Sequence, residues 1–174
     1  MITTTLIMSA MTAMAATSAQ PLVEMPESLK GNPLVEEWNT PYQTPPFSEI
    51  ELAHYEPAID YAIELNRAEI EAIINNPEAP TFENTIVAMN NSGELLGRIS
   101  GVFFVLNNCV TSPEMQQIAL NITPKLTELS NDISLNPALF ERIKVVYDQR
   151  KKLKLDQEDM ALLEDTYKGF ARSG

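Results

Sequence analysis

Two residues of this chain could take part in nucleophilic or metal chemistry: His54, its only histidine, and Cys109, its only cysteine. An H-E-x-x-H zinc motif needs two histidines, so the chain does not contain one. A Ser–His–Asp or Cys–His arrangement would have to use His54, and no nucleophile-elbow sequence is present. A single cysteine also excludes an internal disulfide and a cysteine-rich zinc site. We therefore interpret His54 as a helix-start or core residue, and Cys109 as a buried structural cysteine.

The other residue types with chemical potential do not form a site either. Gly93, Gly97 and Gly101 recur every four residues, which is a helical spacing and not the strand-to-helix turn of a phosphate-binding loop. Acidic pairs such as Glu36–Glu37 and Glu158–Asp159 are common surface features. The sequence thus predicts no catalytic, cofactor-binding or metal-ligating residue in this chain, which by itself is expected to bind no zinc.

The chain has 174 residues and a net charge of −12. Because nucleic acids need a basic footprint, an acidic chain argues against a nucleic-acid partner, and equally against an anionic membrane surface. A hydrophobic content of 44% is typical of a globular protein. Half of the basic residues cluster late in the chain, where they could meet an acidic partner; we favour a solvated surface that complements helix C-termini. They are Arg142, Lys144, Arg150, Lys151, Lys152 and Lys154.

Residues 1–19 carry no charge and end in small residues, a pattern that resembles the apolar core and cleavage region of a signal peptide. No basic residue precedes Lys30, whereas a signal peptide normally opens with positive charge. We expect export to a bacterial periplasm, with no membrane association after signal removal, and keep a cytoplasmic location as the alternative.

Residues 20–48 are rich in proline and polar residues, which predicts an extended strap. Three aromatic residues, Trp38, Tyr42 and Phe47, are expected to anchor this strap on a helical body.

Residues 49–174 predict a multi-helix domain, so the fold class is all-α, and we expect this domain to be truncated at its C-terminal end. Apolar residues at steps of three and four mark a first helix from His54 to Asn75. Capping residues predict later helix starts at Ser112, Asn136 and Asp156.

Two positions could interrupt these helices. Pro124 should kink its helix or split it near Asn121. Between Thr81 and Asn108 the apolar phase is unbroken, which favours one long helix; the alternative is that Gly93 ends a first helix and a second begins at Glu94. We expect the glycine stripe to allow another helix to pack closely, so that Gly97→Leu would destabilise the domain.

Several motifs resemble the thimet oligopeptidase family of zinc metallopeptidases, which includes peptidyl-dipeptidases and oligopeptidase A. Pro-Thr-Phe-Glu-Asn-Thr is the most specific of these motifs. The resemblance runs from about Asn32 to Gly174. The motifs are Asn32-Pro33-Leu34, Trp38, Pro45-Pro46-Phe47, His54 to Ile59, Pro80 to Ile86 and Asn136 to Phe140.

This resemblance implies the N-terminal portion of a large, almost wholly helical enzyme with a deep channel. It implies that zinc and its H-E-x-x-H ligands lie in a catalytic domain outside this chain. It also implies that the full-length protein takes short peptides and releases C-terminal dipeptides. Two other hypotheses stay open: an exported helical module that binds a partner without catalysis, and a degenerate paralogue without the peptidase domain.

Overall fold

The computed structural model describes residues 21–173, which form helices and loops and contain no strand. The predicted all-α class is confirmed. The predicted signal segment lies outside the described residues. The longer helices are α1 (Tyr55–Ile74), α3 (Glu94–Cys109), α4 (Pro113–Ser134), α5 (Pro137–Gln149) and α6 (Gln157–Ser173). The short helical segments are η1 (Glu27–Leu29), η2 (Pro41–Gln43), η3 (Leu52–His54), the π-helical η4 (Phe82–Val87) and α2 (Ala88–Asn91).

The predicted helix starts are confirmed by their capping hydrogen bonds. The Ser112 hydroxyl accepts the Met115 N–H at 3.2 Å. Asn136 caps α5 in the same way, with its side-chain oxygen 3.0 Å from the nitrogen of Leu139. These local contacts satisfy backbone donors that the first turn leaves free, so a helix can begin there without help from distant residues. None of the helices within residues 21–173 is both long and apolar enough to cross a membrane.

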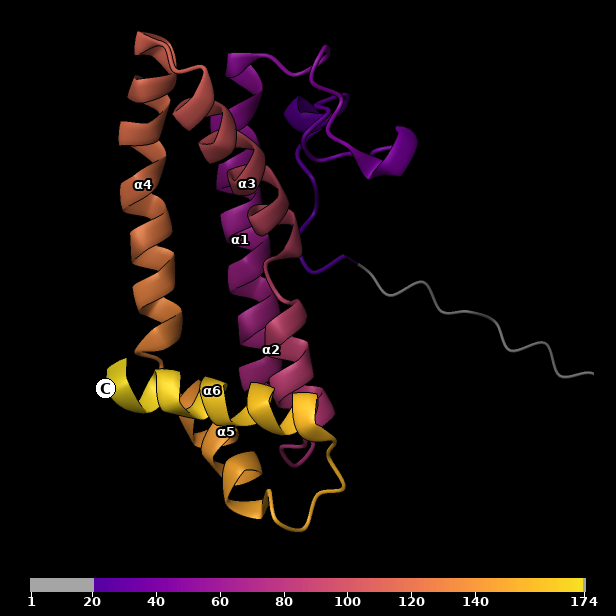
Figure 1. Ribbon diagram of the computed structural model, residues 1–174, viewed down its shortest axis with the longest axis vertical. Coiled ribbons are helices and arrows are strands. Elements are labelled where there is room, and N and C mark those ends of the chain that lie inside the picture. The colour runs from indigo at the N-terminus through magenta and orange to yellow at the C-terminus, as the bar shows by residue number, and fades with distance from the viewer. Residues whose placement is uncertain (1–20, 174) are drawn as a thin grey trace, which may run out of the picture.

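Helix α1 is the central element and contributes to two separate hydrophobic cores along its length (Figure 1). The first core forms where the N-terminal half of α1 packs against α3 and α4, and it also takes Leu34 from the strap. Its fully buried side chains include Ile59, Ile99, Phe103 and Ile122.

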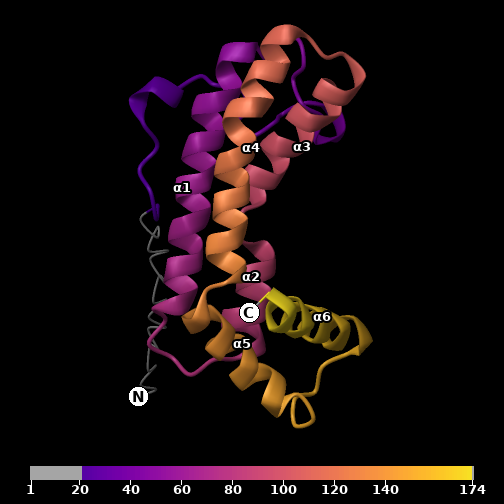
Figure 2. The same ribbon diagram turned by 90° about the vertical axis from the view of Figure 1, so that its left-hand side faces the viewer.

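The second core lies at the other end of α1, where α5 and α6 cross beneath it (Figure 2). Ile70 and Ile73 of α1 meet η4, α5 and α6 there. Leu139, Ile143 and Leu163 are fully buried in this core. Burying each such side chain contributes about 1.5–3 kcal/mol, so both ends of α1 are held by packing.

The single long helix predicted from Thr81 to Asn108 is wrong. Gly93 adopts a left-handed conformation with φ +72°, which ends α2 and lets α3 begin at Glu94. The break separates two segments with different partners: η4 packs in the second core, whereas α3 packs in the first. The unbroken apolar phase did not reveal this, because both segments face α1.

The close packing predicted along the glycine stripe occurs at Gly93, which lies against Asn66 of α1, but not at Gly97 or Gly101. Apart from the neighbouring backbone of α3 itself, no atom lies within 4 Å of the place where a Cβ of Gly97 or Gly101 would be. The stability loss predicted for Gly97→Leu therefore has no steric basis in this chain. Pro124 does not split its helix either, since α4 runs without interruption from Pro113 to Ser134.

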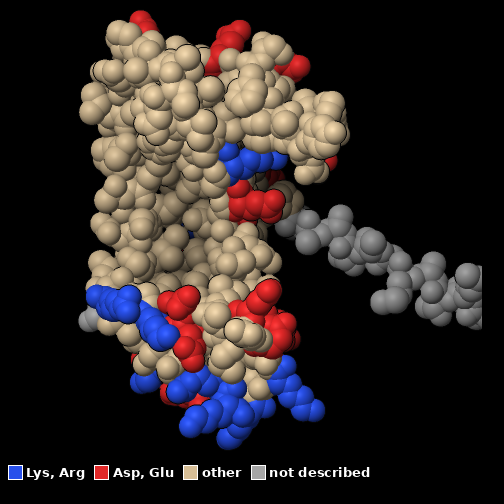
Figure 3. Space-filling model, in the orientation of Figure 1, with Lys and Arg blue, Asp and Glu red and all other residues tan. Residues whose placement is uncertain are grey.

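Charged side chains are unevenly distributed over the molecule. In Figure 3 most of the blue and red residues gather at the lower end, around α5, α6 and the loop between them. Above them, the face formed by α3 and α4 is almost free of charge.

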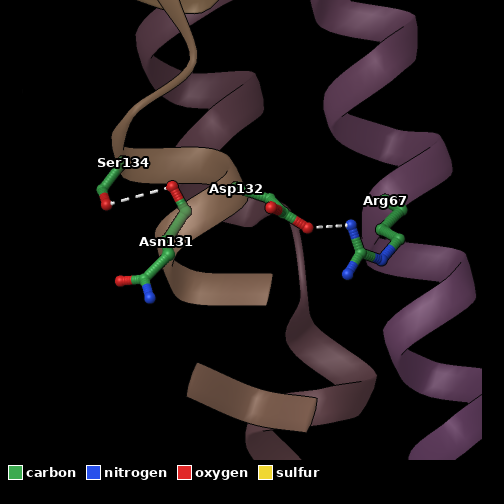
Figure 4. Close-up of polar contacts among 4 residues, drawn as sticks. All are labelled: Arg67, Asn131, Asp132 and Ser134. Carbon is green, nitrogen blue, oxygen red and sulfur yellow. Dashed lines mark hydrogen bonds and ion pairs between the residues drawn. The ribbon is translucent and has the colours of Figure 1, made fainter. Parts of the chain in front are cut away.

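A row of polar contacts sets the register between α1 and α4, which run in the same direction. Asn121 donates to Glu56, Lys125 pairs with Asp60, and Arg67 pairs with Asp132. Figure 4 shows the last pair, with Asn131 and Ser134 beside it at the end of α4. The two ion pairs are each about half exposed, so each contributes only about 0–1 kcal/mol, and the row acts mainly on alignment.

The break at Gly93 gives a prediction with a matched control. We expect Gly93→Ala to lower the free energy of unfolding by at least about 1–2 kcal/mol, because a Cβ disfavours the left-handed conformation. That Cβ would also lie 3.0 Å from the Asn66 side chain. Gly97→Ala, in an open helical position, should instead raise stability by about 0.5–1 kcal/mol. Urea unfolding followed by circular dichroism measures both, and equal effects of the two variants would contradict this account.

Candidate functional site

The Pro-Thr-Phe-Glu-Asn-Thr motif, which carries the most specific resemblance, forms a structural node at the start of η4. The Thr81 hydroxyl accepts the Asn84 N–H at 3.1 Å, while the Asn84 side-chain oxygen accepts the Thr81 N–H at 2.8 Å. This reciprocal pair caps the helix from both directions. The same Asn84 oxygen also accepts the Thr85 hydroxyl at 2.9 Å. Phe82 is buried in the second core, so every described contact of this motif is structural.

Arg142 fastens this node to α5. Its guanidinium donates to the carbonyl oxygens of Asn76, at 3.0 Å, and Glu78, at 3.4 Å. It also reaches the Asn84 side-chain oxygen at 3.4 Å. One side chain thereby holds the loop between α1 and η4 against a helix more than fifty residues later.

Asn32 fixes the strap to the start of α1. Its side-chain oxygen accepts the Leu34 N–H at 3.0 Å, and its amide nitrogen donates to the His54 carbonyl at 3.0 Å. Asn32 is itself buried, so this polar side chain has its partners in place. Leu34 can then enter the first core.

Arg98 of α3 holds the same strap from the other side. It donates to the carbonyl oxygens of Leu34 and Glu36, both at 3.1 Å, and its guanidinium lies 4.7 Å from the centre of the Trp38 ring. The Trp38 indole N–H in turn donates to the Pro33 carbonyl at 2.8 Å. The predicted anchoring role of Trp38 is confirmed.

The anchoring role predicted for the other two aromatic residues, Tyr42 and Phe47, is wrong. Tyr42 is 98% exposed and Phe47 is 56% exposed, so neither ring is buried against the helical body. The strap is held by hydrogen bonds to its backbone, which aromatic content alone does not reveal.

The structure assigns different roles to His54 and Cys109. The His54 Nδ1 accepts the Glu51 N–H at 3.0 Å and completes a capping arrangement before α1, so its interpretation as a helix-start residue is confirmed. Cys109 is exposed at the end of α3, and its interpretation as a buried cysteine is wrong. The last turn of α3 leaves this position outside the core, because Phe103 and Leu106 already cover the side facing α1 and α4.

The late basic cluster is only partly a solvated surface. Lys144, Lys151, Lys152 and Lys154 are exposed, as expected. The arginines are half-buried and partnered: Arg142 forms the node described above, and Arg150 donates to the Tyr147 carbonyl at 2.9 Å while covering its ring at 3.9 Å. One feature of the sequence could have indicated that Arg142 is partly buried. It lies one helical turn after Leu139, a residue of the second core.

The shifted pKa values have local causes. Burial raises the pKa of the Tyr55 hydroxyl in the first core. The pKa of Glu114, at the start of α4, is lowered mainly by a hydrogen bond from the Glu114 backbone N–H and secondly by one from the Ser112 hydroxyl. The hydrogen bond between Glu164 and Lys168 lowers the pKa of that carboxyl and raises that of the ammonium. These groups belong to helix starts, a core and one helix surface, and they do not converge on a reaction centre.

No three His, Cys, Asp or Glu side chains among residues 21–173 are grouped so that they could hold a metal ion. That this chain contributes no catalytic or metal-binding residue stays a prediction. What the described motif residues do is position helices.

The chain is similar in sequence to known peptidases. It is 43% identical to a dipeptidyl carboxypeptidase of Salmonella typhimurium and 41% identical to one of Escherichia coli, over 143 residues in each case. It is 27% identical to oligopeptidase A of Escherichia coli over the same length. Each match covers 82% of this chain. The chain is therefore a relative of the dipeptidyl carboxypeptidases and of oligopeptidase A, as its motifs predicted.

The chain spans about a fifth of the length of these curated relatives, since the matches cover 20–21% of them. No model of a protein family matches the chain.

The Arg142 node gives a second prediction. We expect Arg142→Ala to lower the free energy of unfolding by about 1.5–3 kcal/mol, because it removes charge-assisted hydrogen bonds to backbone carbonyls. Arg142→Lys should restore only part of this loss, since an ammonium lacks the planar fork of a guanidinium. Lys144→Ala, an exposed change on the same helix, serves as the control in chemical denaturation. Equal stabilities of the Arg142→Ala and Lys144→Ala proteins would show that the node is not important.

Proposed function

We propose that this chain is the N-terminal channel-wall domain of a zinc metallopeptidase that hydrolyses short peptides and releases dipeptides from their C-termini. The observation that carries the proposal is the 41–43% identity to two dipeptidyl carboxypeptidases over 143 residues. In this account the catalytic domain lies in the part of a longer protein that this sequence does not include.

The pattern of identities supports dipeptide release over internal cleavage. The chain is 43% identical to a dipeptidyl carboxypeptidase but 25–27% identical to the oligopeptidase A proteins. Specificity for C-terminal dipeptides is thus the reading that the closer relatives favour, and short peptides are the proposed substrates.

Zinc in this proposal is held outside the present chain. The donors available here are a poor fit: His54 uses its Nδ1 in the cap before α1, and Cys109 stands exposed at the far end of another helix. Soft thiolate and imidazole ligands, which zinc prefers, are therefore not combined here. The chain's own residues instead build a rigid wall, because Arg98, Arg142 and the two cores hold every long helix in place.

A rigid helical wall is a suitable part of an enzyme that admits short peptides. Helix α1 is held at both ends by the two cores, and the motif residues at the start of η4 are occupied in structural contacts. We further propose that the protein is exported to a bacterial periplasm.

The third prediction tests this function in the full-length protein. We expect it to release dipeptides from the C-terminus of a blocked tetrapeptide, as detected by mass spectrometry. A zinc chelator should abolish the release and added zinc should restore it. This chain alone should release no dipeptide, with or without added zinc. Cleavage at positions that release no C-terminal dipeptide would overturn the proposal, as would activity that survives complete removal of zinc.

A further inference from the structure

The chain between Ile99 and Pro124 is unusual in its lack of charge. It includes the second half of α3 and the first half of α4, and Glu114 is its only charged residue, whereas 21% of the whole chain is charged. Figure 3 shows the result as a broad uncharged face over these two helices.

Only one side of this segment packs into the first core. Phe103 and Ile122 are buried in it, but Val105, Val110 and Leu120 are 61%, 67% and 69% exposed. A groove of about 490 Å³ lies between the end of α3 and the adjoining side of α4. We call the following residues the uncharged surface: Asn107, Val110, Leu120, Thr123 and Pro124.

Two glycines lie on another side of α3, which also carries Arg98 and is not the side of the groove residue Asn107. Gly97 and Gly101 precede Val105 by eight and four residues, so all three lie on the same side of the helix. Both glycines are exposed, and apart from the neighbouring backbone of α3 itself the space within 4 Å of a Cβ there is empty. Another backbone could approach α3 closely at these positions.

We propose that the uncharged surface is the docking site for the catalytic domain of the same longer protein. This inference rests on the function proposed above. The dipeptidyl carboxypeptidases extend well beyond the match, which leaves about four fifths of each outside it. A permanent contact within one chain suits a surface without charges, because its apolar side chains stay covered and need no steering of an incoming partner.

A second copy of this chain fits the surface less well. Each copy carries a net charge of −12, so association of two copies brings like charges together. Exposed side chains as large as Val110 and Leu120 are also costly to leave in water, which favours a partner that is always present.

Cys109 provides a direct probe, because it is exposed at the end of α3 next to Val110. The experiment compares the labelling rate of Cys109 by iodoacetamide in this chain alone and in the full-length protein, with peptide mapping by mass spectrometry. We expect labelling in the full-length protein to be at least tenfold slower. Labelling of the urea-unfolded full-length protein, which should be as fast as in the chain alone, is the control.

A pair of variants tests the surface itself. Leu120→Glu should leave the melting temperature of this chain alone unchanged or higher, but should lower that of the full-length protein. Leu135→Glu is the matched control, since Leu135 is 57% exposed and lies after the end of α4, away from the groove. Leu135→Glu should change the melting temperatures of this chain and of the full-length protein by the same amount.

The outcomes separate this inference from the proposed function. A full-length protein with zinc-dependent peptidase activity, but with Cys109 labelled as fast as in the chain alone, would overturn the docking site and leave the function standing. Protection of Cys109 in this chain alone that rises with concentration would assign the surface to a second copy. A full-length protein without peptidase activity would overturn the function, while protection of Cys109 in it would still support docking of the remaining chain.

Discussion

The close approach of Gly93 to the middle of α1 is the constraint on which the two-core arrangement depends. The Gly93 N–H donates to the Glu69 carboxylate at 2.7 Å, and the Asn66 side chain fills the space where a Cβ would lie. Asn66 is buried, and its amide also reaches Glu69 at 3.4 Å. Because the left-handed Gly93 interrupts the helix here, η4 and α3 can approach α1 as separate segments. Each then completes a different core on the same central helix.

How much of the fold the sequence predicts depends on the range of the contact involved. Helix starts at Ser112 and Asn136 follow from residues three positions apart, so local pattern was sufficient. The break at Gly93 depends on Glu69, which is 24 residues away, and apolar periodicity is the same for one helix or two. The role of Arg142 depends on carbonyl groups more than sixty residues earlier, and charge counting placed it among solvated residues. Exposure of Cys109 was missed because only the packed structure shows which side of the last turn faces the core.

The motifs that carry the resemblance to peptidases are structural clamps in this part of the molecule. Thr81 and Asn84 cap each other, and Asn32 joins the strap to α1. The first clamp acts within one helical turn and the second joins segments 22 residues apart, and both use their polar atoms in these contacts. We propose that the chemistry belongs to another part of a longer protein and that this chain supplies a wall with an uncharged face.

The central claim is that these helices act as one part of a larger peptidase, and the size of the native polypeptide tests it most directly. An antibody raised against residues 32–174 would be used on extracts of the source cells, and the mass of the recognised protein measured. Our account predicts a single species several times larger than 19.4 kDa. A species at or slightly below 19.4 kDa would contradict the account, because the helical wall would then exist without a catalytic domain.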